Sequence, residues 1–323
     1  MLLLCHITDV DHQKEEEYKK LNLTPNDLTN KFEPNGIKWI LNEAMSISIT
    51  RFKFFVALVA IIQVPAIMLS LCFSGLTTQE NRYDLILQIS SYLIAFFAMT
   101  LSSSLIISAV GQHYAYNKVT LEFCFKRTWW RILSISSWAM LLTAPLFAIT
   151  YLANNVVSNE ENTKSMLVII VAMLIFIPFL IYTSFYIQTV IIEGLNLING
   201  LKRSAYLIHR KVLKVFTAVI LIGLIAFGLS FIVNIPFALL EISELDKSTI
   251  IGNTNPSMLF YLIVFLRNFV DSIIVFPILI TAGTLLYFDI RTDKENYDIN
   301  KLLNDLNIST ETSQIQKEHT INN

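Results

Sequence analysis

The sequence predicts an all-α, polytopic membrane protein whose six transmembrane helices form three repeats, each an interfacial amphipathic helix followed by a helical hairpin. Two observations lead to this prediction. Hydrophobic residues make up 54% of the chain and charged residues only 15%, against roughly 25% charged in a soluble domain, so lipid must cover much of the surface. A basic, aromatic-rich stretch followed by two apolar spans also recurs, starting near Gly36, Lys118 and Leu195.

Six apolar segments reach the length of about 20 residues that a helix needs to cross the hydrocarbon core. They are Phe54–Phe73, Tyr83–Tyr114, Ile132–Leu152, Met166–Ile192, Val212–Leu240 and Met258–Phe288. The second span of each hairpin is over-long, at roughly 27–32 residues, so it must tilt, kink or extend beyond the bilayer. Pro178 and Pro277 are the expected kink sites. Residues 35–300 form the membrane domain.

Basic residues gather on alternate connections between the spans. Arg82, Lys164 and Lys247 are the only bases in the turns after the first, third and fifth spans. The opposite connections hold Lys118, Lys126, Arg127, Arg131, Lys202, Arg203, Arg210, Lys211 and Lys214. By the positive-inside rule, both termini are cytoplasmic. Residues 1–34 are then a partly disordered cytoplasmic segment, and residues 301–323 a polar cytoplasmic tail that we expect to be disordered.

The connection before the fifth span shows the amphipathic pattern most clearly. Its apolar residues step by three or four positions, as on one face of a helix: Ile198, Leu201, Ala205, Ile208 and Val212. Such a helix lies on the cytoplasmic leaflet with its bases towards anionic headgroups. The expected headgroup contacts are Lys126, Arg127, Arg131, Lys202, Arg210 and Lys211. An ordinary loop that obeys the positive-inside rule is the alternative, although it does not explain the apolar stripe.

Two groups of charges call for partners. Glu193, Arg203, Asp289 and Arg291 share one depth at the cytoplasmic interface and have opposite signs, so we expect an ion-pair cluster that locks the repeats together. Arg267 and Asp271 lie four residues apart in the sixth span, on one helix face, and we expect them to pair. Counted back from Phe288, this pair falls near the outer interface, which favours a structural pair over a translocation site.

The sequence lacks the common signatures of catalysis. It contains no GxSxG elbow, P-loop, GxGxxG or HExxH motif, and its three cysteines form no CxxC pair. We therefore expect no enzyme activity, no cofactor and no metal site. A net charge of −1 gives no overall field that would attract nucleic acid. The expected partners are membrane lipid and either another protein or further copies of the chain.

Two stretches resemble the membrane-domain family attached to some glycerophosphoryl diester phosphodiesterases, which also exists as free-standing prokaryotic membrane proteins. The first comprises Glu193-Gly194, Leu201-Lys202-Arg203-Ser204, Leu207 and Val215-Phe216. The second comprises Leu286-Tyr287-Phe288-Asp289-Ile290-Arg291, Glu295 and Asp298. The hydrolase of that name uses a separate soluble barrel, typically of about 250 residues, with metal-binding His and Glu. The resemblance therefore implies the membrane portion alone, in a prokaryotic plasma membrane.

These observations favour a non-enzymatic membrane scaffold or accessory subunit, which contacts lipid headgroups or a partner at the cytoplasmic face. The alternative is a transporter or permease whose long spans, kinked at Pro178 and Pro277, line a cavity. A continuous polar cavity that reaches the midplane would favour the transporter, and a dry core would favour the scaffold.

Overall fold

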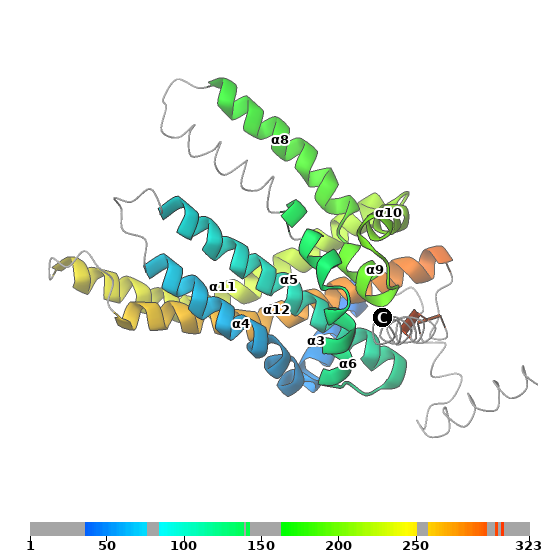
Figure 1. Cartoon of the computed structure of the whole chain (residues 1–323), viewed down its shortest axis with the longest axis horizontal. Helices are drawn as coiled ribbons and strands as arrows, with labels where there is room; N and C mark the ends of the chain where they lie inside the picture. Colours follow the sequence, from blue (N-terminus) through cyan, green and yellow to red (C-terminus); the bar gives the residue numbers. More distant parts are fainter. Residues whose placement is uncertain are drawn as a thin grey trace, which may run out of the picture.

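A computed structural model describes residues 36–75, 84–138, 140–142, 163–250, 258–295, 301–302 and 305–306. Within them every regular element is a helix (Figure 1). Three short helices lie where the sequence predicts the interfacial helices of the three repeats: α3 (Ile37–Thr50), α6 (Leu121–Trp129) and α10 (Leu197–Ile208). The longer ones are α4 (Phe52–Gly75), α5 (Asp84–Tyr116), α8 (Thr163–Tyr182), α11 (Val212–Ile250) and α12 (Met258–Glu295), with α9 (Tyr186–Ile192) between α8 and α10.

Among the described residues, four helices are long and apolar enough to cross a membrane: Phe52–Phe73, Ile89–Tyr116, Val212–Glu244 and Met258–Glu295. They correspond to the first, second, fifth and sixth expected spans. Within the third and fourth expected spans, the described residues contain shorter apolar helical stretches, Ile132–Leu142 and Phe176–Ile192. The rest of the expected third span, the first 34 residues and most of the tail lie outside the described residues.

The expected fourth span, Met166–Ile192, is not one continuous helix. The chain runs helically through Pro178 and breaks at Thr183–Phe185, between α8 and α9. Here the backbone N–H of Phe185 leaves the helical ladder and donates to Ser204 Oγ at 3.2 Å. The hydroxyl of Ser204 in turn donates to Tyr182 O. Ser204 of α10 thus satisfies the backbone groups on both sides of the break. Pro178, the expected kink site, lies within α8.

Helix length also differs from the expectation in the third hairpin. The sequence predicts that the second member of each hairpin is the longer one. In the structure α11 has 39 residues and α12 has 38, because α11 continues beyond Leu240 through Glu241 to Ile250. At 1.5 Å per residue both helices are about 58 Å long, well beyond the roughly 30 Å hydrocarbon core.

Helix α12 is the centre of the packing. It contacts α3, α4, α5, α10 and α11, and its residues from Val275 to Arg291 supply much of the buried core. The last third of α5, from Leu105 to Ala115, is similarly buried. Helices α3, α6, α9 and α10 gather at one end of the body, whereas α8 diverges from α5 (Figure 1). We call the end with these four helices the basic end.

Candidate functional site at the basic end

The last turns of α12 bring three polar side chains onto one face of the helix. Tyr287, Arg291 and Glu295 are each four residues apart, a spacing that stacks side chains along a helix. Facing them are Glu193, directly after α9, and Arg203 of α10. Side chains from three helices therefore meet at one place, although they are up to about a hundred residues apart in the chain.

Arg203 is the central donor of this group. Its Nε donates to Glu193 Oε2 at 2.7 Å, while Nη1 and Nη2 donate to the two oxygens of Glu295 at 2.5 and 2.7 Å. Such a bidentate, charge-assisted contact is among the stronger hydrogen bonds in proteins. Burial opposes the charge on Arg203, but the carboxylates of Glu295 and Glu193 outweigh it and raise the pKa of the guanidinium above its ordinary value.

Glu193 and Arg291 extend the group towards the protein interior. Tyr287 OH donates to Glu193 Oε1 at 2.6 Å, and Arg291 Nη1 lies 3.6 Å from the same oxygen. Arg291 also pairs with Asp305 at 3.0 Å. We call the set Glu193, Arg203, Tyr287, Arg291, Glu295 and Asp305 the Arg203 network. It joins α9, α10, α12 and the C-terminal tail through contacts that a single helix could not make.

Asp289, the fourth member of the expected cluster, does not join this network. It pairs instead with Lys214 of α11 at 2.9 Å, and its side chain is only 3% exposed. The reason is helix geometry: Asp289 lies two residues from Arg291, and residues two apart do not face the same side of a helix. The expected four-residue cluster is thus two separate sets of ion pairs, with Asp289 holding α11 rather than α9 and α10.

The network makes a specific prediction about charge exchange. The double variant Glu193→Arg/Arg203→Glu should remain about 1–2 kcal/mol less stable than the wild type. Glu295 would face a second carboxylate at position 203, and Arg291 would face a second guanidinium at position 193. The measurement is thermal unfolding of the purified chain in micelles. Full recovery of stability relative to the single variants would instead mean that Glu193 and Arg203 act as an isolated pair.

Arg127 was expected to contact lipid headgroups, but the structure buries it. Its guanidinium donates to four backbone carbonyls: Ile191 O and Ile192 O at 2.6 Å, Leu306 O at 3.0 Å and Asp305 O at 3.3 Å. The first two acceptors belong to the C-terminal turn of α9, where helical carbonyls lack partners within the helix. Positive charge also complements the negative end of the helix dipole. Arg127 is therefore a clamp on α9 and the tail.

Arg131, another expected headgroup contact, packs on the turn that follows α9. Gly194 has a φ of +80°, and a Cβ at this position would lie 2.6 Å from Arg131 Nη2. The glycine is required because it adopts the left-handed conformation and leaves room for the guanidinium. Burial lowers the pKa of Arg131 to about 10, which still leaves it charged at neutral pH. With Arg127, it places two positive charges beside the end of α9.

The other expected headgroup contacts divide into two kinds. Lys126, Lys202 and Arg210 are exposed, and the exposed side chains of Trp129 and Trp130 lie close in sequence to Lys126. Lys211 is engaged within the protein, where its Nζ lies 2.9 Å from Asp293. Three of the six residues thus present their charges outward. Arg127 and Lys211 have partners within the protein, and Arg131 packs beside Gly194.

The expected pair Arg267–Asp271 is replaced by two bridges between α11 and α12. Arg267 donates to Glu241 at 2.7 Å. Asp271 accepts hydrogen bonds from Ser230 Oγ at 2.5 Å and Asn234 Nδ2 at 3.1 Å. All three partners lie on α11, which packs against α12. Contacts between the two helices therefore replace the expected contact along α12.

The two bridges between α11 and α12 predict whether the stability effects of two substitutions add. The destabilisation caused by Arg267→Gln and that caused by Asp271→Asn should add within about 0.5 kcal/mol, because the two residues share no partner. Arg267→Gln and Glu241→Gln should instead show a coupling energy of roughly 0.5–1 kcal/mol. A double-mutant cycle on denaturant unfolding in micelles measures both terms. A larger coupling between positions 267 and 271 than between 267 and 241 would contradict the bridges.

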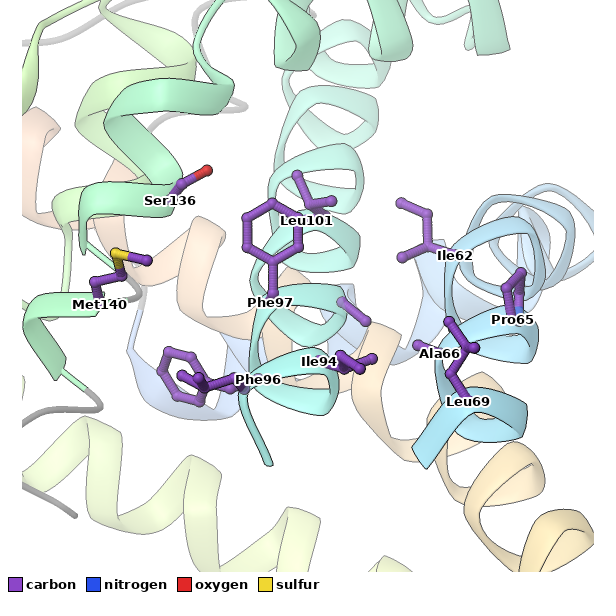
Figure 2. A pocket seen from close by; sticks show the side chains of 12 residues that line it. Ile62, Pro65, Ala66, Leu69, Ile94, Phe96, Phe97, Leu101, Ser136 and Met140 are labelled. Carbon is purple, nitrogen blue, oxygen red and sulfur yellow. The ribbon is translucent and has the colours of Figure 1, made fainter. Parts of the chain in front are cut away.

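A cavity of about 420 Å³ lies away from the basic end, between α4, α5 and the Ile132–Leu142 helix (Figure 2). Its walls include Ile62 and Leu69 of α4, Phe97 and Leu101 of α5, and Met140. Ser136 is the one polar residue in the lining, and its hydroxyl donates to Ile132 O. The cavity therefore offers hydrocarbon surface and no spare hydrogen-bonding group from its side chains.

The chemistry of these sites is that of ion pairing. Among the described residues, no group of three or more His, Cys, Asp or Glu side chains is placed to hold a metal ion. The thiol of Cys124 is buried, and burial raises its pKa to about 12, which is the opposite of an activated nucleophile. The charged groups of the Arg203 network have partners within the protein.

Sequence reasoning missed several of the residues involved. Lys214, Asp293 and Asp305 were not expected to take part, and Tyr287 and Glu295 were noted only through the family resemblance. The spacing of Tyr287, Arg291 and Glu295 was available as a signal, since it places them on one helix face. Within the tail that we expected to be disordered, Leu302 and Leu306 are buried, and their spacing of four residues was a further signal.

Helix content and geometry define the class: in the part of the chain that the structure describes, this is an all-helical protein with four helices long and apolar enough to cross a membrane. Comparisons with protein-family models, with curated proteins and with solved structures find no match. The resemblance to the phosphodiesterase-associated membrane domain therefore stays a prediction.

Proposed function

We propose that the chain is a non-enzymatic integral protein of a prokaryotic plasma membrane, and that it serves as a scaffold or accessory subunit. In this proposal six spans form three repeats, both termini lie in the cytoplasm, and the basic end meets lipid headgroups or a partner at the cytoplasmic face. The supporting observation is the separation of charges at this end. Lys126, Lys202 and Arg210 are exposed, whereas the acidic groups of the Arg203 network are paired inside.

Exposed aromatic side chains beside these bases support contact with a membrane surface. Trp129 is 69% exposed and Trp130 is 47% exposed, and both lie close in sequence to Lys126. Tryptophan is enriched at membrane interfaces because its ring is amphipathic, and each base near an anionic surface is worth roughly 1 kcal/mol. A surface of this composition suits the headgroup region of a bilayer.

Two of the proposed repeats place equivalent residues in equivalent environments. The sequence Lys126-Arg127-Thr128 in α6 corresponds to Lys202-Arg203-Ser204 in α10. In both, the lysine is exposed, the arginine turns towards the protein and the small hydroxyl residue is buried. Each arginine clamps the region where α9 ends, Arg127 through carbonyls and Arg203 through Glu193. This correspondence supports an internal repeat in which one residue type performs one task twice.

The family resemblance supports the same proposal. The stretches that carry it contain Glu193, Arg203, Tyr287, Arg291 and Glu295, which are five of the six members of the Arg203 network. If the resemblance reflects membership of that family, this network is what the two stretches encode. The transporter alternative calls for a polar path, and the cavity between α4 and α5 is lined by apolar side chains.

Lipid-dependent stability tests the headgroup contact. The full chain is placed in nanodiscs of phosphatidylcholine, with or without phosphatidylglycerol, and its thermal unfolding is measured. We expect the anionic lipid to raise the Tm of the wild type, and the variant Lys126→Gln/Lys202→Gln/Arg210→Gln to lose that increase. Lys211→Gln is the control, because Lys211 is paired with Asp293; it should lower stability equally in both lipids. An identical Tm for the wild type in both membranes would contradict the headgroup contact.

A further inference from the structure

The described tail residues are docked onto the basic end. Leu302 is 0% exposed and Leu306 is 1% exposed, whereas Lys301 between α12 and these leucines is exposed. The leucines are four residues apart in helical backbone, so they form a single apolar face. Leu306 Cδ2 lies 4.0 Å from the position that a Cβ would take on Gly111 of α5. The leucine thus packs on α5 at a point where no side chain intervenes.

Polar contacts fix the same segment on two other helices. Arg291 of α12 pairs with the carboxylate of Asp305 at 3.0 Å. Arg127 of α6 donates to the backbone carbonyls of Asp305 at 3.3 Å and Leu306 at 3.0 Å. The segment is recognised through two leucines, one carboxylate and the carbonyls of a helical turn. Recognition of this kind requires the amphipathic pattern of the docked segment more than its full sequence.

Arg127 connects the docked segment directly to α9. The guanidinium of Arg127 also donates to Ile191 O and Ile192 O at 2.6 Å. If the tail leaves, the donors directed at Asp305 and Leu306 lose their acceptors inside a buried site, and an unsatisfied buried donor is costly. The tail and the end of α9 therefore stabilise each other through Arg127.

We propose that Gly111, Arg127 and Arg291 form a docking surface for a short amphipathic segment, and that the described tail residues, 301–302 and 305–306, occupy it as a releasable strap. The segment that fits has two leucines four residues apart and an acidic residue directly before the second. By occupying the surface, the strap holds α5, α6 and α12 together and completes the clamp on α9. This inference does not depend on the proposed membrane function.

Hydrogen–deuterium exchange on the full chain tests the strap. The wild type should show slow exchange in the tail, and Leu302→Ser/Leu306→Ser should speed it about tenfold or more. Exchange should also rise at the C-terminal end of α9, which a strap without coupling would not alter. Lys301→Ser is the control, because it changes an exposed side chain of the same segment. Fast exchange in the wild-type tail, or an unchanged α9 in the leucine variant, would overturn the proposal.

Binding in trans provides the second test. A fluorescent synthetic peptide with the tail sequence around Lys301–Leu306 is titrated onto each full-length protein and followed by anisotropy. It should bind saturably to Leu302→Ser/Leu306→Ser, whose docking surface is vacated, and at least about tenfold more weakly to the wild type, whose own strap competes. A peptide carrying the same two serines should not bind. Equal binding to both proteins, or no binding to either, would refute the docking surface.

Discussion

Replacing Arg127 with alanine is expected to destabilise the folded chain by about 3–5 kcal/mol. The guanidinium makes four hydrogen bonds to backbone carbonyls from α9 and the tail, and a hydrogen bond to a charged group contributes roughly 1.5–3 kcal/mol. The full sum is not expected, because water can enter the space that the side chain leaves. Denaturant unfolding in micelles, followed by tryptophan fluorescence, measures the change.

Two further substitutions separate the geometry of Arg127 from its charge. Arg127→Lys keeps the charge, but a compact ammonium on a flexible stem cannot reach acceptors on two segments at once, so at least half of the loss should remain. Lys126→Ala removes a charge from the adjacent, exposed residue and should change stability by no more than about 0.5 kcal/mol. If Arg127→Ala were as mild as Lys126→Ala, the guanidinium would not be a clamp.

Gly194→Ala is expected to cost about 3 kcal/mol, the second large effect. A left-handed backbone conformation costs an L-residue with a side chain roughly 1–2 kcal/mol, and Gly194 has a φ of +80°. The added methyl group would also displace the Arg131 guanidinium, whose Nη2 lies 2.6 Å from the Cβ position. Displacement of a charged donor from the end of α9 adds a loss of about 1–2 kcal/mol. The same unfolding measurement applies.

The chain offers a matched control for this glycine. Gly223 lies within α11, and a Cβ there meets nothing within 4 Å. Gly223→Ala should therefore be neutral or stabilise by up to about 1 kcal/mol through helix propensity. The double variant Gly194→Ala/Arg131→Ala should lose less stability than the sum of its single changes. Without the Arg131 guanidinium, the methyl group at position 194 loses the side chain that it would clash with. Strict additivity would show that Arg131 and Gly194 are not in contact.

Much of the helical architecture could be predicted because it depends on local sequence. Length and hydropathy are properties of contiguous residues, and four of the expected spans correspond to helices that are long and apolar enough to cross a membrane. The break between α8 and α9 could not be placed, because it depends on Ser204 of α10. A proline inside the span was the local signal, but the decisive hydrogen bonds come from a distant helix.

The site was harder to predict because charge does not specify a partner. Lys126 and Arg127 are adjacent and equally basic, yet successive residues point about 100° apart on a helix, so one is exposed and the other buried. Asp271 and Arg267 were paired along one helix, whereas their partners lie across the hairpin. The contact between Glu193 and Arg203 was expected from their shared depth and opposite signs, and the structure contains it.

The central position of α12 has a consequence for biosynthesis. Ribosomes deliver α3 to the membrane early and α12 only after every other long helix, yet α3 packs against α12. Helices inserted into a bilayer associate by side-to-side packing after insertion. Until α12 has been synthesised, α3, α4 and α5 therefore lack one of the neighbours they pack against. Packing onto α12 is therefore a late step of tertiary assembly, whereas α4 and α5 can already pack against each other before α12 exists.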